Sequence, residues 1–581
     1  MKWQVKAKAP SAFFKKFPEF SPLIIQLLYN RGIKTQQQID EFFNSDFNSD
    51  LHDPFLLKGM KKAIKRIKQA IKKKEKITIY GDFDADGVCS TAIIYLTLKE
   101  LGHKKIDIYI PDREKENHGL NEKSIKKIAK AGTKLIITVD CASSDLEEVD
   151  LANSLDVDVI ITDHHQTGKK LPKTVAMVNP WQKDDKYPFK KLAGAGVAYK
   201  VACALLPDQD PFKKWLLDLT ALATVADVMP IVGENRTLVK YGLGVLAQTK
   251  WIGLQELMRI SKVEPEVIQD SLDGEAPSTN LDTYTLGFVL GPRLNAASRM
   301  DHASRAFHLL ISQDRKEAEK LSKGINQKNS LRQNLTSKVV REIEGRLEKD
   351  ISKGGISKII FEGSPDWPVG LVGLIAGKMA DKYRRPAVVY YQKGDLIYAS
   401  CRSIPQFDLI KMLDKCAHLF DDYGGHKGAA GFRVDVSNLD QVKNIFNKLV
   451  EKELEDKDLT PVLETDAELF LEDIDWQNYD QIQMFSPFGR NNDKPKFLAR
   501  KLEICSLKTV GNGDKHLKME LMMFGKSNKS KKFNAIAFGF GEKEEILKKG
   551  QLIDIVFEII VNQWNGYRGL EMKIVDLKIT Q

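Results

Sequence analysis

Short apolar runs alternate with amphipathic stretches between residue 76 and about residue 180. Five runs have the length and the β-branched composition of buried strands: Ile77–Tyr80, Ile106–Ile110, Leu135–Val139, Val157–Ile161 and Ala176–Val178. The stretches between them carry apolar residues at helical spacing. Strands that alternate with helices are typical of a parallel, doubly wound α/β sheet, which we predict here.

The pattern changes three times after this sheet. The stretch from about 190 to 310 is mainly helical, and Ser312–Ile351 has no proline and a high charge density, so we predict one long exposed connecting helix. Strand patterns at Lys358–Phe361, Ala387–Tyr391 and Leu396–Ser400, with a helix at Leu371–Lys382, predict a second α/β lobe. The last part is rich in β patterns and suits a small barrel of the OB type.

These patterns divide the chain into five predicted parts. They are an N-terminal helical extension at 1–75, a first α/β domain at 76–311, a connecting helix at 312–352, a second α/β domain at 353–457 and a β-barrel domain at 458–581. A chain of 581 residues is long enough for several cores, because one core rarely exceeds about 250–300 residues.

Charge favours an anionic partner. Lys and Arg number 89 against 79 Asp and Glu, a formal net charge of +10, which points to nucleic acid first. The helix predicted at Met60–Lys76 is apolar on one face and almost all lysine on the other. That face is either simply solvated or a flank for nucleic acid, and the sequence leaves both possibilities open.

Cysteine usage and hydropathy bear on location. The six cysteines are scattered without a CxxC pair, which argues against a zinc ribbon or a disulfide framework and for a reducing compartment. No apolar run approaches the roughly 18 residues that a membrane span needs. The N-terminus lacks the apolar core of a signal peptide. We therefore expect a cytoplasmic protein without a membrane partner.

Three acids follow the first predicted strand at alternate positions: Asp82, Asp84 and Asp86. A strand that ends in carboxylates beside a helix start lies where open α/β sheets bind ligands. Acids this close repel one another unless a cation lies among them, and hard oxygen ligands suggest Mg²⁺ or Mn²⁺. The alternative is an acidic turn in which one acid caps the helix.

Two further strands also end in polar chemistry. Asp140 follows Leu135–Val139, and Asp163, His164 and His165 follow Val157–Ile161. Asp227 lies on a helical stretch in an apolar setting, where an unpartnered acid is costly to bury. Singly, each could be a helix cap or a surface group.

Taken together, these groups suit a site for two cations that activates water for attack on phosphorus. Asp140 is the natural bridge, and Asp84 and Asp86 could each face a different ion. His164 and Asp227 would complete the set, and mixed carboxylate and imidazole ligands favour Mn²⁺ over Mg²⁺. His165 could then act as an acid or hold a phosphate oxygen, and Asp163 could orient a histidine.

Several motifs resemble one known group of enzymes. DFDADG at 82–87, VDCA at 139–142, DHH at 163–165 and TVADV at 224–228 resemble the signatures of the DHH phosphoesterase superfamily. GFVLGPRLNAASRM, CRSIPQFDL, GGHKGAAGF and the C-terminal β segment resemble its RecJ family. The resemblance covers nearly the whole chain. It implies a DHH catalytic domain, a DHH-associated domain and a nucleic-acid-binding OB domain.

The resemblance also implies function and residue roles. It implies a single-strand-specific 5′-to-3′ DNA exonuclease that uses two Mn²⁺ or Mg²⁺ ions and releases mononucleotides in DNA repair and recombination. The implied metal ligands are Asp84, Asp86, Asp140, His164 and Asp227, with Asp82 near the site and His165 and Asp163 beside it. The implied phosphate-holding groups are Arg113, Arg293, Ser400, Arg402 and His426.

The chain departs from the family pattern at three positions. Pro368 follows Trp367 where the family commonly has histidine, and Ala142 and Ser298 replace glycines. The alternatives are a DHH phosphodiesterase for short oligonucleotides or cyclic dinucleotides and a non-catalytic replication scaffold. Single-strand-binding protein, a helicase and a monomeric state are further expectations.

Overall fold

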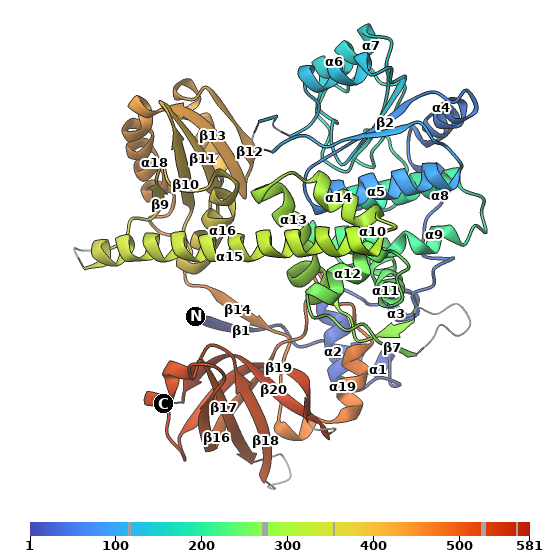
Figure 1. Ribbon diagram of the computed structural model, residues 1–581. Helices are drawn as coiled ribbons and strands as arrows, with labels where there is room; N and C mark the ends of the chain where they lie inside the picture. The colour runs from blue at the N-terminus through green and yellow to red at the C-terminus, as the bar shows by residue number, and fades with distance from the viewer. Residues whose placement is uncertain are drawn as a thin grey trace. The chain divides into compact units, whose positions relative to one another are not determined.

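The computed structural model of the protein (Figure 1) describes residues 1–113, 115–116, 118–269, 277–352, 355–524, 530–564 and 567–580. The chain forms two compact units. One comprises Met1–Asp50, Pro230–Arg236 and Pro461–Gln581, and the other comprises Leu51–Met229 and Thr237–Thr460. The predicted five-part division is finer than this and stays a prediction.

The first sheet of the larger unit is parallel throughout. Its strands are β2 (Ile77–Gly81), β3 (Ile106–Tyr109), β4 (Leu135–Val139), β5 (Asp158–Thr162) and β6 (Ala176–Val178). They lie in the order β3-β2-β4-β5-β6. The chain leaves β2 for β3 on one side and then crosses to β4 on the other. The gap between β2 and β4 is therefore the switch point where such sheets bind ligands.

Helices cover both faces of this sheet (Figure 1). They are α4 (Met60–Lys72), α5 (Ala85–Glu100), α6 (Glu122–Lys130), α7 (Leu146–Ser154) and α8 (Gly194–Leu205). On one face, Ile125 of α6 and Val149 of α7 are buried against Ile136 and Ile161. On the other, α5 packs on β2 and β4, and α8 on β4 and β5. The predicted doubly wound sheet is confirmed.

The rest of the lobe that contains this sheet is helical, as predicted. Its elements are η1 (Pro54–Leu56), α9 (Phe212–Trp215), α10 (Leu217–Ala226), α11 (Glu234–Ala247), α12 (Ile252–Ile260), the π-helix η2 (Thr285–Leu290), α13 (Gly291–Met300) and α14 (Ser304–Ile311), with a small hairpin of β7 (Val267–Gln269) and β8 (Ser278–Thr279). α15 (Arg315–Ile351) is one helix of 37 residues.

The prediction that α15 is an exposed connector is wrong for one of its faces. Val339, Ile343 and Leu347 are buried in the core of the second lobe, and Ala318 and Ile325 are buried nearer its start. Its apolar residues are sparse but recur at helical spacing, so a narrow stripe is buried while the charged remainder stays in water.

The second lobe is the mixed α/β domain that the sequence predicts. The elements are β9 (Ile360–Gly363), η3 (Val369–Leu371), α16 (Val372–Tyr383), β10 (Ala387–Lys393), β11 (Leu396–Arg402), α17 (Leu409–Asp414), η4 (Ala417–Leu419), β12 (Asp422–His426), β13 (Ala429–Asp435), η5 (Val436–Asn438) and α18 (Leu439–Glu453). The sheet order is β12-β13-β11-β10-β9. α15 and α16 cover one face and α17 and α18 the other.

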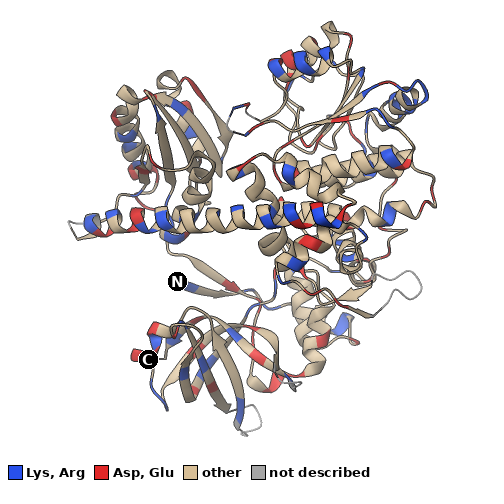
Figure 2. Ribbon diagram, viewed as in Figure 1, with Lys and Arg blue, Asp and Glu red and all other residues tan. Residues whose placement is uncertain are grey.

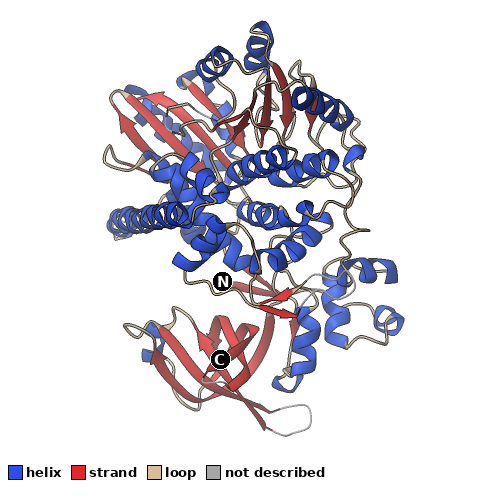
Figure 3. Cartoon of the chain, turned by 45° about the vertical axis from the view of Figure 1, so that its right-hand side comes forward, coloured by secondary structure: helices blue, strands red, loops and turns tan. Residues whose placement is uncertain are grey.

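The smaller unit joins the N-terminal helices to a β-barrel. Its elements are β1 (Lys2–Val5), α1 (Ser11–Lys16), α2 (Pro22–Asn30), α3 (Gln36–Phe43), β14 (Val462–Thr465), β15 (Ala467–Glu468), η6 (Leu471–Asp473), α19 (Trp476–Gln483), β16 (Phe497–Val510), β17 (His516–Phe524), β18 (Ser530–Ala537), η7 (Gly541–Glu545), β19 (Leu552–Trp564) and β20 (Tyr567–Ile579). Pairing of β16 with both β17 and β19 closes the barrel (Figure 3). Closure removes exposed sheet edges and agrees with an OB fold.

Candidate active site

The first site residues lie where β2 runs into α5. Asp82 follows the strand directly, and Asp84 caps α5 by accepting hydrogen bonds from the backbone N–H groups of Asp86 and Gly87, at 2.9 and 3.1 Å. Gly87 is required here because a Cβ would lie 2.5 Å from the Asp82 carbonyl oxygen. The acidic-turn alternative is therefore correct for the backbone role of Asp84, and it does not exclude a metal-binding role.

Asp86 is fixed by a second helix. Its two carboxylate oxygens accept hydrogen bonds from the backbone N–H groups of Gly194 and Ala195, both at 2.7 Å, at the start of α8. The positive end of a helix favours a negative charge at this place. A Cβ on Gly194 would lie 2.7 Å from Asp140, so α8 can approach the acids this closely only with glycine there.

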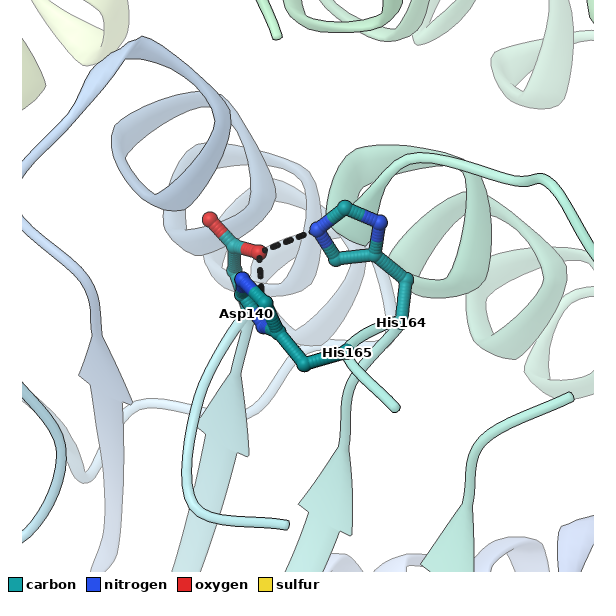
Figure 4. Close-up of side chains that lie close together, drawn as sticks. All are labelled: Asp140, His164 and His165. Atoms are coloured by element: carbon teal, nitrogen blue, oxygen red, sulfur yellow. Dashed lines mark ion pairs between the residues drawn. The ribbon is translucent and has the colours of Figure 1, made fainter. Parts of the chain in front are cut away.

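Asp140 lies at the centre of the cluster. It follows β4 with a φ of +62°, a conformation that turns its side chain back over the end of the sheet. Its Oδ1 is 3.0 Å from Nε2 of His164 and 4.0 Å from Nδ1 of His165 (Figure 4). The same oxygen is buried and has no hydrogen-bond partner among the described residues.

His164 presents one ring nitrogen to the acids. Its Nδ1 lies 3.0 Å from the Leu192 carbonyl oxygen, which accepts a hydrogen bond from Nδ1–H and leaves Nε2 with a free lone pair. Nε2 is 3.7 Å from carboxylate oxygens of Asp86 and of Asp227. Burial lowers the pKa of His164, which favours the neutral, metal-binding form.

His165 and Asp163 form a separate pair. Nδ1 of His165 is 2.8 Å from Asp163 Oδ1, and Asp163 also accepts the backbone N–H groups of Ser143 and His164. Burial lowers the pKa of His165, but the bond to Asp163 outweighs it and raises that pKa to about 9. Burial raises the pKa of Asp163, and its bonds, with His165 first, lower it overall. Asp163 thus orients an imidazolium.

Asp227 joins the cluster from the helical side. It is the residue that ends α10, and its backbone N–H bonds to the Ala223 carbonyl at 2.9 Å. Its side chain is 28% exposed, more than those of Asp86 and Asp140, so it borders the opening of the site.

Seven of these side chains fit a divalent-cation site. Three sets have ligand atoms within 4.8 Å of one another: Asp140 with His164 and His165, Asp86 with His164 and Asp227, and Asp82 with Asp84 and Asp140. Burial and the neighbouring Asp82 and Asp86 raise the pKa of Asp84 to about 6, and burial with Asp86 raises that of Asp140. The buried Oδ1 of Asp140, which accepts no hydrogen bond from the described residues, and this mutual repulsion suit hard cations.

The predicted phosphate-holding residues do not all lie in one environment. Arg113 lies over the Phe83 ring at 4.7 Å, beside the acids. Arg402 donates to Ser400 Oγ at 3.1 Å, and a Cβ on Gly373 would lie 3.0 Å from that oxygen. Ser400, Arg402 and the start of α16 thus form one close-packed corner.

Arg293 and His426 are placed differently. Arg293 donates to the Asn326 side chain and to the Val289 carbonyl, at 3.0 and 2.6 Å. His426 is exposed at the end of β12, and its Nδ1 accepts the Gly428 N–H at 3.2 Å. Their roles toward phosphate stay predictions.

Sequence reasoning missed two side chains of the site. His118 Nδ1 lies 3.1 Å from Asp82 Oδ1, and this bond raises the His118 pKa. Arg299 lies among Arg113, Arg332, Arg402 and Asp84, and burial, with those three arginines, lowers its pKa to about 9. Arg299 stands inside the motif that suggested Arg293, so that motif was the available signal.

The three departures from the family pattern have structural consequences. Ala142 has a φ of +81°, where a glycine is favoured, whereas Ser298 is an ordinary buried helical residue. Pro368 precedes η3, and the next turn presents the Gly370 carbonyl, which accepts a hydrogen bond from Arg299 at 2.9 Å. This loop therefore positions an arginine of the site through its backbone.

The chain resembles known proteins in sequence and in fold. Three domain families match: the DHH family, N-terminal domain, at residues 76–224, the DHHA1 domain at 353–452, and the RecJ OB domain at 465–576. The single-stranded-DNA-specific exonuclease RecJ of Bacillus subtilis (strain 168) is 38% identical over 567 residues, covering 97% of this chain and 68% of that protein. This chain belongs to the RecJ family.

Other RecJ proteins agree in length and fold. RecJ of Dickeya dadantii is 29% identical, with 97% of each chain covered. The crystal structure of RecJ in complex with Mn²⁺ from Thermus thermophilus matches with a TM-score of 0.81 at 25% identity, covering 100% of this chain and 80% of that one. The family resemblance and the fold class predicted from the sequence are confirmed.

Proposed function

We propose that this chain is a single-stranded-DNA-specific 5′-to-3′ exonuclease that hydrolyses phosphodiester bonds and releases 5′-mononucleotides in DNA repair and recombination. The observation that carries the proposal is the buried cluster of Asp84, Asp86, Asp140 and His164 at the switch point of the parallel sheet. The RecJ relatives from Bacillus subtilis and Dickeya dadantii are named single-stranded-DNA-specific exonucleases.

The metal-binding residues have distinct parts in the proposal. Asp84, Asp86, Asp140, His164 and Asp227 would hold two divalent ions, Mn²⁺ or Mg²⁺, with Asp140 between them. Bound divalent ions lower the pKa of a coordinated water and neutralise charge that develops on phosphate oxygens. Asp82, bonded to His118, completes the acidic side of the cluster.

The remaining side chains handle protons and phosphate. His165, whose Nδ1 is held 2.8 Å from Asp163 and whose pKa is raised by that bond, can donate a proton or a hydrogen bond from Nε2 to the substrate. Arg113, Arg299 and Arg402 lie close enough to interact electrostatically, and guanidinium groups hold phosphate through paired N–H donors. Such a cluster suits the phosphate at a 5′ end.

Several finer points rest on the resemblance. Binding of a single-strand-binding protein or a helicase, a monomeric state and a cytoplasmic location stay predictions. In the part of the chain that the structure describes, no helix combines the length and apolar character of a membrane span.

A digestion assay tests the proposal. Single-stranded DNA with a 5′-phosphate and a 3′-label is incubated with the protein and Mn²⁺, beside blunt duplex DNA and a cyclic dinucleotide. We expect stepwise shortening of the single strand, release of mononucleotides, and no digestion by Asp140→Asn. Preferential cleavage of the cyclic dinucleotide would support the small-substrate alternative, and no cleavage of either would support the scaffold.

A further inference from the structure

Two large aromatic rings are exposed together at η2: Tyr284, the residue before it, and Phe288 within it. Tyr284 is 62% exposed and Phe288 is 72% exposed, and Phe288 is the most exposed of the large hydrophobic residues that the structure describes. The rings stack face to face, with centroids 5.2 Å apart and an interplanar angle of 17°. Burying these rings would release free energy, so a stacked pair left in water is a candidate binding surface.

The pair is carried by the element that packs behind a metal ligand. A Cβ on Gly287 would lie 3.1 Å from the Val225 side chain, and one on Gly291 would lie 3.0 Å from Ala226. Val225 and Ala226 are the last residues of α10, and Asp227 is the residue that follows them. η2 is a π-helix, a form that is rare and often found at functional sites.

Positive charge lies next to the pair. Arg293 reaches back along η2 to donate to the Val289 carbonyl, next to Phe288, and Arg332 on α15 lies close enough to be affected by its charge. Nε of Arg332 is buried without a hydrogen-bond partner, and neither arginine has an ion pair with a carboxylate among the described residues. Lys and Arg recur along α15 (Figure 2). Two neighbouring guanidinium groups that have no ion pair with a carboxylate favour the binding of an anion.

Aromatic faces beside unpaired arginines match single-stranded nucleic acid. Bases stack on aromatic rings whatever their sequence, while cationic side chains follow the backbone. A protein or lipid partner would not need a flat, stacked pair next to two arginines. η2 packs against α10, the helix that ends next to Asp227, so the pair is carried by an element that adjoins the proposed active site.

We propose that Tyr284 and Phe288 form a stacking platform for bases of the DNA substrate, with Arg293 and Arg332 holding an adjoining phosphate. The proposal rests on the proposed exonuclease function. An enzyme that releases mononucleotides from a 5′ end has one nucleotide on the 5′ side of the scissile bond. Bases stacked on the platform would therefore belong to nucleotides on the 3′ side of the scissile bond.

Binding to oligothymidylate with a moving abasic window tests the platform. The DNA carries a 5′-phosphate and a 3′-fluorophore, and anisotropy is measured with EDTA so that no cleavage occurs. For the wild type, we expect the affinity to fall by about fivefold or more when the abasic sites replace the bases that stack on Tyr284 and Phe288. Each stacked base contributes about 1–3 kcal/mol of binding free energy. Windows farther along should have less effect.

The variants make the result specific. The double variant Tyr284→Ala/Phe288→Ala should bind intact DNA as weakly as the wild type binds DNA with abasic sites at the platform. Its affinity should not change when the abasic sites are introduced. Tyr284→Phe/Phe288→Tyr should behave as the wild type. Phe55→Ala, which removes another exposed ring at 41% exposure, serves as the matched control and should also behave as the wild type. Equal melting temperatures check folding.

The outcomes separate the platform from the function. If the wild type digests single-stranded DNA but the alanine double variant keeps wild-type affinity and the same window effect, the platform is overturned and the exonuclease stands. If the wild type digests no single-stranded DNA in the assay described above, the proposed function fails, and the platform fails with it.

Discussion

Asp140 and Ala142 flank Cys141 with φ values of +62° and +81°. The left-handed conformation of Asp140 has a role at the site, because it brings the Asp140 carboxylate within 3.0 Å of His164. Ala142 places only a buried methyl group there, and a left-handed conformation costs an L-residue about 1–2 kcal/mol.

Ala142→Gly should therefore stabilise the protein. Removing the left-handed strain outweighs the extra chain entropy that glycine loses, about 0.5–1 kcal/mol, so the free energy of unfolding should rise by roughly 0.5–1 kcal/mol. Denaturant unfolding measures it. Ala129→Gly in helix α6 is the control and should lower stability by about 1 kcal/mol. A loss of stability in Ala142→Gly would contradict the strain assigned here.

Asp218 should make stability depend on pH. Burial raises its pKa to about 7, although Thr249 donates to its carboxylate at 2.6 Å. Because this folded pKa exceeds the unfolded value near 4, the protonated carboxyl stabilises the fold below about pH 4, and that contribution is lost as pH rises to about 7. Melting temperatures from pH 5 to 8 should fall more steeply for the wild type than for Asp218→Asn. Parallel curves would contradict this.

At the residue scale, the sequence predicted the acids better than the basic groups. Asp82, Asp140 and Asp163 follow strands directly, with His164 next, and the carboxyl ends of adjacent parallel strands meet at one edge, so their proximity could be predicted. Arg299 comes close to Arg113 and Arg402 only through the packing of α13, α16 and the second sheet. No local pattern carries that information.

At the element scale, the start of α8 supports the site. The N–H groups of Gly194 and Ala195 hold Asp86, and this geometry needs α8 to approach Asp140 without a Cβ at position 194. Loss of that approach would move two predicted metal ligands at once.

Gly194→Ala should lower activity much more than it lowers stability. Its methyl group would lie 2.7 Å from Asp140, so we expect kcat to fall by about tenfold or more, as for other groups that orient metal ligands. Gly345→Ala, in helix α15, meets no atom within 4 Å and is the matched control. Equal activity of the two variants would contradict this role of α8.

The elements show which patterns are reliable. β4 and β6 have the predicted bounds because continuous apolar runs mark strands buried on both faces. β1, β16 and β17 were not predicted: β1 pairs with β14 from the far end of the chain, and β16 and β17 alternate polar with apolar residues. The burial of one face of α15 was missed because its apolar stripe is thin.

At the scale of the whole molecule, a short segment crosses between compact units. Pro230–Arg236 belongs to the smaller unit although both of its flanks belong to the larger one. Within the smaller unit, Arg236 donates to the carbonyl oxygens of Phe42, Phe485, Met484 and Pro487, at 2.8–3.4 Å. Burial lowers its pKa to about 9.

Arg236→Lys should destabilise the smaller unit. One ammonium group cannot satisfy these carbonyls together, so unfolding should become easier by about 2–3 kcal/mol, as seen by calorimetry or by hydrogen exchange of barrel amides. Arg500→Lys, at a half-exposed ion pair in the same unit, should change stability by less than about 0.5 kcal/mol. Equal effects would show that the carbonyl cluster does not depend on the guanidinium.

The account as a whole depends on cations held by the buried acids, and calorimetric titration of the metal-free protein with Mn²⁺ measures this directly. We predict about two bound ions per chain for the wild type. Asp140→Ala should lose most of that binding, whereas Asp107→Ala, at an exposed acid on β3, should keep it. No binding to the wild type, or equal binding by Asp140→Ala, would contradict the assignment of the active site.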